Sequence, residues 1–369
     1  MALEGVKLPF YLKATIIILG FIALITVLYI SKSIIVPLVF ATIIAIVLHP
    51  LVLFFVHLRI NRVFAIAITM FLTFLVIASF GILIISQVSR FIESWPVLIE
   101  RFSILLNQTI ADASEYFEKD PQKIHDWISK TLEQIVNIST GAIGQTLVIL
   151  GSGLVILFLL PVYIFLILLY EPLLIEFIHR LFSADNQNRV TEIVVQIKSV
   201  IQRYLVGLII EAGIMTILNT AVLLILGIEY ALIIGFFGAL INIIPYIGGL
   251  VAVALPVIVA LATKSTPMYA LYVMAAYYFI QLIDNNYIVP KIVASKVKIN
   301  ALFSIIVVFA GNALWGVPGM FLSIPVLAII KLICDHVESL KPWGFLLGDT
   351  MPPLIKIDTI LKKIKGKSN

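Results

Sequence analysis

Long apolar segments, separated by short polar stretches, recur along most of the chain. A transmembrane helix needs about 20 apolar residues to cross a hydrocarbon core of roughly 30 Å. Eight segments approach or exceed this length: 14–31, 33–56, 63–89, 146–170, 205–228, 230–263, 267–289 and 299–330. The pattern therefore predicts an all-α polytopic membrane protein with about eight hydrophobic segments.

The composition supports this prediction. Hydrophobic residues make up 62% of the 369 residues and charged residues only 12%, against about 45–50% and about 25% in soluble domains. No soluble core of this size can bury so much apolar surface, so the lipid bilayer must be the main solvent. The net charge of +5 is concentrated in the C-terminal tail, where it suits an anionic cytoplasmic leaflet rather than nucleic acid.

The first apolar segment follows Lys7 and Lys13 and resembles the start of a signal peptide. The segment is long, no A-x-A-like cleavage site closes it, and another apolar segment follows at once. We therefore expect a retained first span.

Two hydrophilic insertions interrupt the apolar pattern. The first, 90–145, carries five basic and eight acidic residues, and Asp120-Pro121 predicts the start of an amphipathic helix there. The second, 171–204, has apolar residues at helical spacing and is expected to run as an interfacial helix into the next span. The predicted domains are a three-span region (1–89), an extracytoplasmic helical insertion (90–145), a fourth span with the interfacial helix (146–204), a transport core (205–332) and a basic cytoplasmic tail (333–369).

Two of the apolar segments carry helix breakers near their centres. At 1.5 Å per residue, a single helix over 230–263 would extend about 50 Å, well beyond the hydrocarbon core. Proline and glycine leave peptide groups that lipid cannot satisfy, so such backbone must contact protein or a water-filled cavity. Paired interrupted segments of this kind point to the binding site of a transporter. The breakers are Pro245, Gly248 and Gly249 in the first segment and Gly311, Gly316, Pro318 and Gly319 in the second.

The two broken segments allow two threadings through the membrane. If each crosses once as a kinked span, 16 of the 25 Lys and Arg residues are cytoplasmic; if each folds back as a re-entrant hairpin, the count is 18. The positive-inside rule therefore favours two hairpins. Both threadings place the N- and C-termini in the cytoplasm and the 90–145 insertion outside. We expect a multi-pass protein of the bacterial cytoplasmic (inner) membrane.

Acidic residues within the apolar segments are candidates for a binding site. Glu211 lies inside 205–228, where a carboxylate costs several kcal/mol unless it faces a cavity or a partner. It can bind a proton or a cation, or it can pair with a basic group near a membrane face; both interpretations stay open. Asp284 is the second such acid, at the polar end of 267–289.

Amide groups and irregular backbone complete the candidate site. Gln281, Asn285 and Asn286 cluster with Asp284 before Pro290, which is expected to end the segment; the alternative is a helix-end cap at the membrane interface. The candidate substrate- or ion-binding residues are Glu211, Asn242, Pro245, Tyr246, Gly248, Gly249, Gln281, Asp284, Asn285, Asn286, Pro290 and Asn312.

Several chemistries have no motif in the sequence. The chain lacks a Walker A motif, H-E-x-x-H, a CxxC pair, G-x-S-x-G and a Rossmann glycine fingerprint. Cys334 is the single cysteine, so a cysteine metal cluster is impossible. We expect neither enzymatic activity nor a cofactor or metal site.

The C-terminal half carries three distinctive motifs. They are Asn242-Ile-Ile-Pro-Tyr-Ile-Gly-Gly, Gln281-Leu-Ile-Asp-Asn-Asn-Tyr-Ile-Val-Pro, and the glycine segment 311–319 followed by Ser323-Ile-Pro. Together with the order of spans and insertion, these motifs resemble the autoinducer-2 exporter (PerM-type permease) family over nearly the whole chain. The positions that fall on family motifs are Asn242, Pro245, Tyr246, Gly248, Gln281, Asp284, Asn286 and Pro290.

The resemblance implies a secondary transporter that assembles as a homo-oligomer. Some members export autoinducer-2, and others exchange sodium for protons. Leu208 follows Gly207 where many relatives carry a polar residue, so the resemblance does not fix the substrate. The leading hypothesis is an exporter of a small polar molecule or ion with Glu211 or Asp284 as the coupling carboxylate. The alternatives are a sodium/proton antiporter, a passive oligomeric channel, and a membrane-bound sensor that uses the 90–145 insertion.

Overall fold

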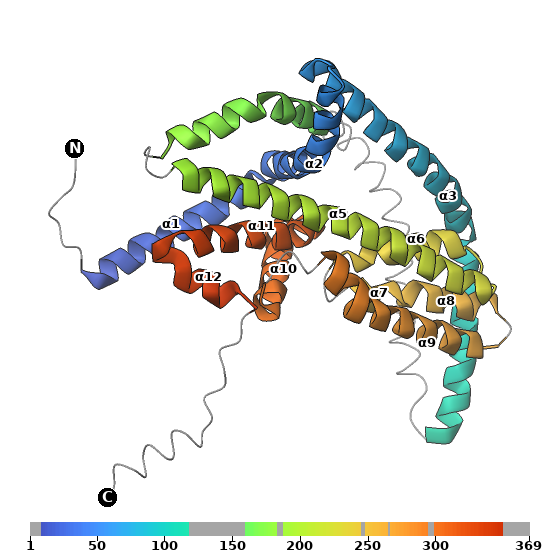
Figure 1. Cartoon of the computed structure of the whole chain (residues 1–369). Helices are drawn as coiled ribbons and strands as arrows, with labels where there is room; N and C mark the ends of the chain where they lie inside the picture. The colour runs from blue at the N-terminus through green and yellow to red at the C-terminus, as the bar shows by residue number, and fades with distance from the viewer. Residues whose placement is uncertain are drawn as a thin grey trace, which may run out of the picture.

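The computed structural model describes residues 9–117, 159–182, 187–244, 248–264, 266–293 and 299–349. Within these ranges the chain is helical apart from its turns and one isolated bridge between Ile299 and Gly348. Six of the described helices are long and apolar enough to cross a membrane. The prediction of an all-α polytopic membrane protein is therefore confirmed (Figure 1).

The first three spans lie where the apolar pattern predicts them. They correspond to α1 (Phe10–Ile30), α2 (Lys32–His57) and α3 (Arg62–Phe117). No residue of α1 is buried, as expected for a helix surrounded by lipid. α3 continues as a single helix past residue 89 to Phe117. The start of the 90–145 insertion therefore extends the helix of the third span. Asp120-Pro121 and the amphipathic helix expected after it lie outside the described residues.

The fourth span and α5 (Gln187–Ile225) are described on either side of residues 183–186. The described part of the fourth span is the helix Leu159–Arg180, which extends ten residues beyond the predicted end at 170. α5 is one helix of 39 residues that contains both the end of the 171–204 insertion and most of the fifth span, so the predicted continuity of the two is confirmed. It contacts α2, α6, α9 and α11, and Figure 1 shows it running through the middle of the fold. The domain boundaries themselves stay a prediction.

The second broken segment is a helical hairpin. α10 (Ala301–Trp315) and α11 (Val317–His336) are joined by Gly316 alone, whose φ of 68° and ψ of −147° are essentially restricted to glycine. The Ser323 hydroxyl donates to the carbonyl of Val307 at 2.8 Å. A Cβ on Gly311 would collide with the carbonyl oxygen of Gly319. The two helices therefore pack closely and run back along each other.

The first broken segment also folds back. α6 (Ala231–Asn242) ends before the break, and the chain resumes as α7 (Gly248–Ala252) and α8 (Ala254–Thr263). A Cβ on Gly248 would collide with the carbonyl oxygen of Ile241, and Ile234 of α6 shares a buried cluster with Val259 of α8. Both broken segments are hairpins rather than kinked single helices. The membrane face from which each hairpin enters stays a prediction.

The seventh segment differs from its prediction at Pro290. α9 (Met268–Ile283) continues without interruption into the π-helical element η2 (Asp284–Val293), which contains Pro290. The expected end of the segment before this proline is therefore wrong. In an α-helix the proline ring clashes with the carbonyl four residues earlier, whereas a π-helix has a wider turn with hydrogen bonds to the fifth preceding residue. The wider turn lets the helix carry the proline.

The end of the described chain packs against the second hairpin. A short 3₁₀ turn, η4 (Glu338–Leu340), leads from α11 to α12 (Lys341–Leu347). At the turn of this hairpin, the indole of Trp315, the last residue of α10, donates to the carbonyl of Leu28 in α1 at 3.0 Å.

Candidate functional site

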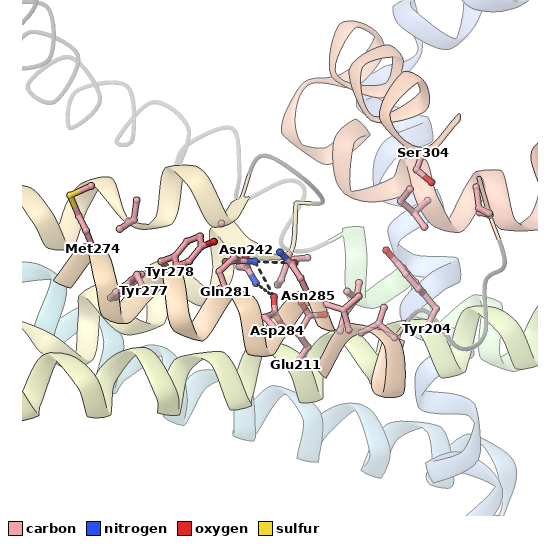
Figure 2. Close-up of a pocket in the computed structure, with 18 residues that line it drawn as sticks. Tyr204, Glu211, Asn242, Met274, Tyr277, Tyr278, Gln281, Asp284, Asn285 and Ser304 are labelled. Atoms are coloured by element: carbon pink, nitrogen blue, oxygen red, sulfur yellow. Dashed lines mark hydrogen bonds between the residues drawn. The ribbon is translucent and has the colours of Figure 1, made fainter. Parts of the chain in front are cut away.

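A cavity of about 730 Å³ lies where the middle of α5, the first hairpin and the α9–η2 helix meet, with the second hairpin at one end. Its lining residues come from seven helical elements, α5, α6, α7, α9, η2, α10 and α11, and from three residues between helices, Ile243, Val253 and Ile299. Figure 2 shows a central group of polar side chains, Glu211, Asn242, Gln281, Asp284 and Asn285, with Tyr204 and Ser304 farther along the cavity. The lining residues are Tyr204, Leu208, Glu211, Asn242, Ile243, Gly249, Val253, Met274, Tyr277, Tyr278, Gln281, Asp284, Asn285, Val289, Val293, Ile299, Ser304 and Ile324.

Asp284 lies at the junction of α9 and η2, and only 1% of its surface is exposed. Its Oδ2 accepts hydrogen bonds from Nδ2 of Asn242 at 2.9 Å and from Nε2 of Gln281 at 3.3 Å. Its Oδ1 is buried without a hydrogen-bond partner among the residues that the structure describes. Buried polar atoms of this kind are rare and point to a missing ligand, ion or water. One carboxylate oxygen is thus held by two helices, and the other can take a ligand.

Glu211 is the second acid of the cavity and is 5% exposed. It comes from α5, lines the same cavity as Asp284 and lies near it in Figure 2. Two like charges repel strongly where the surroundings have a low dielectric constant. A cation or a bound proton placed between them relieves this repulsion.

The charged side chains that line the cavity are all acidic. The cavity contains two carboxylates, three amides and three tyrosines, and none of its described lining residues is Lys, Arg or His. Gln281 also donates to Oδ1 of Asn285 at 3.2 Å, so the amides form a connected set beside Asp284. This arrangement favours a cation or a neutral solute with several hydroxyl groups and disfavours an anion.

The cavity brings together half of the residues proposed from the sequence. Gly249 approaches Gln281 so closely that a Cβ there would collide with the side-chain amide. The proposed residues that line the cavity are Glu211, Asn242, Gly249, Gln281, Asp284 and Asn285.

Four other proposed residues lie outside the lining. Gly248 packs against the end of α6, and Asn286 is exposed, with its amide donating to the carbonyl of Leu282 at 2.8 Å. Pro290 lies on the exposed side of η2, and Asn312 is exposed on α10. Pro245 and Tyr246 lie outside the described residues.

Sequence reasoning missed the aromatic residues of the site. Tyr204, Tyr277 and Tyr278 line the cavity, and the hydroxyl of Tyr277 is buried with no hydrogen-bond partner in the described ranges. Helical spacing could have identified two of them, because residues three, four or seven positions apart lie on the same face of a helix. Tyr204 is two turns before Glu211, and Tyr277 is one turn before Gln281. Ser304 also lines the cavity, and no spacing marked it.

The helical spans, the hairpins and the polar cavity define a multi-pass membrane protein of the transporter class. A family model described as AI-2E family transporter matches residues 17–339. The chain belongs to this family, as its motifs predicted.

The similarity to individual relatives varies in extent. The AI-2 transport protein TqsA of Escherichia coli (strain K12) is 25% identical over 357 residues, which cover 95% of this chain and 97% of that protein. YueF of Bacillus subtilis (strain 168), described only as a candidate transport protein, is 32% identical over 117 residues. YrrI from the same organism, described likewise, is 29% identical over 115 residues. These two matches cover 31% and 32% of the lengths of YueF and YrrI.

Proposed function

We propose that this protein is a secondary transporter that exports a small polar solute across the bacterial cytoplasmic membrane, with the 730 Å³ cavity as its binding site. One observation carries the proposal: Glu211 and Asp284 are both buried and line the same cavity. Ionisable groups within membrane segments are costly and mark substrate or ion pathways.

The chemistry of the lining suggests the substrate class. Asn242, Gln281 and Asn285 supply amide donors and acceptors, and the tyrosines supply hydroxyl groups and aromatic faces. A neutral solute with several hydroxyl groups fits these partners, whereas a phosphorylated or carboxylated solute would face two acids without a counter-ion. AI-2, which the relative TqsA is named for transporting, is the first solute to test.

The two acids suggest how transport is coupled to an ion gradient. We assign binding of the coupling proton or sodium ion to Asp284 and Glu211, because Oδ1 of Asp284 has no partner among the described residues and Glu211 lines the cavity near it. A bound cation would neutralise this pair and favour one position of the hairpins. Release of the cation would favour the other position. An antiporter that exchanges sodium for protons is the alternative, and it requires only these two carboxylates.

Flux in proteoliposomes tests the proposal. The purified full-length protein is reconstituted, and AI-2, a neutral polyol of similar size and sodium are each measured with and without an imposed proton or sodium gradient. We expect saturable flux that depends on one of the two gradients. Non-saturating flux that is independent of both would instead show a passive channel.

The proposed transporter also has an expected subunit assembly and an expected orientation in the membrane. We propose a homo-oligomer with both termini in the cytoplasm, in line with the family resemblance and the charge distribution along the chain. The mass of the reconstituted particle measures the number of subunits.

A further inference from the structure

A second cavity, of about 250 Å³, lies between α2, the helix Leu159–Arg180 and the first part of α5. It shares no lining residue with the transport cavity. Nine of its thirteen lining residues are aliphatic, and three charged or titratable side chains, His49, Glu171 and Lys198, also line it. The cavity therefore combines an apolar lining with a polar cluster, which we call the polar rim, of His49, Glu171, Lys198 and Arg62, the last of which pairs with Glu171 but does not line the cavity.

The polar rim joins four helices around one carboxylate. Oε2 of Glu171 lies 2.9 Å from the Arg62 guanidinium and 3.0 Å from Nε2 of His49, and Oε1 pairs with the ammonium of Lys198. Arg62 comes from α3 and also donates to the carbonyl of Leu168 at 2.7 Å. The ammonium of Lys198 lies 3.3 Å from Nε2 of His49.

The charges of this rim do not balance. Arg62 and Lys198 are two basic side chains, and Glu171 is the only carboxylate that pairs with either of them in the described part of the chain. The Nε of Arg62 is buried and has no hydrogen-bond partner among the described residues. A surplus positive charge and an unpaired donor are costly next to lipid, so the rim lacks an anion.

We propose that this second cavity binds an anionic phospholipid, with an acyl chain in the aliphatic cavity and the headgroup phosphate on Arg62 and Lys198. A phosphate matches the guanidinium geometry and supplies the missing negative charge. The aliphatic walls favour a lipid over a free anion, because an anion alone would leave the apolar space empty. Basic pockets between transmembrane helices on the cytoplasmic side are typical of such binding, and the predicted threading puts Arg62 and Lys198 on that side. The lipid stabilises the junction of α2, α3, α5 and the helix Leu159–Arg180.

Thermal unfolding of the purified full-length protein in detergent tests the proposal. Dioleoyl phosphatidylglycerol is expected to raise the unfolding temperature by several degrees, and dioleoyl phosphatidylcholine and inorganic phosphate are expected to leave it unchanged. Lys198→Gln should lose most of this shift. The matched control is Arg180→Gln, because Arg180 is exposed and pairs only with Glu176 in the described structure; it should keep the full shift.

A second variant separates lipid binding from general damage to the rim. Val194 lines the aliphatic cavity, so Val194→Phe fills the space and leaves every charge in place. It should abolish the response to phosphatidylglycerol, and native mass spectrometry should show fewer retained lipid molecules than in the wild type. Equal shifts with the two lipids, the same shift with inorganic phosphate alone, or an unchanged response in Val194→Phe would overturn the proposal. These readouts are independent of transport activity.

Discussion

Asn242, the last residue of α6, donates a hydrogen bond of 2.9 Å to Asp284, the first residue of η2 (Figure 2). The bond links the end of the first hairpin helix to the π-helical element 42 residues later in the chain. Any movement of the hairpin away from η2 would break this bond and change the surroundings of the Asp284 carboxylate. Binding at the carboxylate and the position of the hairpin are therefore physically connected.

We expect Asn242→Ala to reduce gradient-driven flux at least tenfold. Hydrogen bonds to charged groups contribute roughly 1.5–3 kcal/mol, and about 1.4 kcal/mol corresponds to a factor of ten in a rate. The matched control is Asn286→Ala, since Asn286 is exposed and lies outside the cavity lining. Proteoliposome flux measures both variants. Equal flux in the two variants would show that transport does not depend on the hydrogen bond between Asn242 and Asp284.

A side chain at Gly249 should weaken solute binding. A Cβ at this position collides with the Gln281 amide, which then moves away from Asp284 and Asn285. We expect Gly249→Val to raise KM for the transported solute about tenfold, and concentration-dependent flux measures this change. Gly213→Val, at a helical glycine with no heavy atom within 4 Å of the added Cβ, is the control. An unchanged KM in Gly249→Val would show that Gln281 does not contact the solute.

A side chain at either of two glycines of the second hairpin, Gly316 at the turn and Gly311 in α10, should destabilise the protein. Gly316→Ala forces a backbone conformation that costs of order 1–3 kcal/mol, and Gly311→Ala overpacks the α10–α11 contact by a similar amount. We expect both variants to lower the unfolding temperature in detergent. Gly81→Ala, where the added Cβ meets nothing within 4 Å, should leave it unchanged. A wild-type unfolding temperature in Gly316→Ala would rule out the tight turn.

The threading of the first hairpin can be measured at Lys264, between α8 and α9. With both broken segments as re-entrant hairpins, this residue lies outside the cell; with kinked single spans it lies in the cytoplasm. We expect Lys264→Cys, in a Cys334→Ser background, to react with an impermeant thiol reagent added to the outer face. Reaction only after the membrane is opened would place Lys264 inside and refute the hairpin threading.

The sequence predicted the spans and the two hairpins because both follow from backbone physics. Twenty apolar residues match the bilayer, and glycine with proline in an overlong apolar segment cannot stay in one lipid-exposed helix. The end of α3 was less predictable. Polar residues begin at 90, but an amphipathic stretch can continue the same helix outside the membrane, and α3 reaches Phe117.

The cavity was predictable only in part. Its acids and amides stand out because such groups are scarce in membrane segments, and Glu211, Asn242, Gln281, Asp284 and Asn285 all line it. The tyrosines did not stand out, because aromatic residues are common in membrane helices. Ser304 reaches the cavity only through the fold of the second hairpin.

Proton- or sodium-driven flux through the two acid variants tests the transport site most directly. Asp284→Asn and Glu211→Gln are compared with the wild type and with Glu192→Gln, a control at an exposed position of the same α5 helix. We expect Glu192→Gln to match the wild-type rate and at least one cavity variant to lose gradient-driven flux at least tenfold while still folding and reconstituting. Wild-type rates in both Asp284→Asn and Glu211→Gln would contradict a transport site in this cavity.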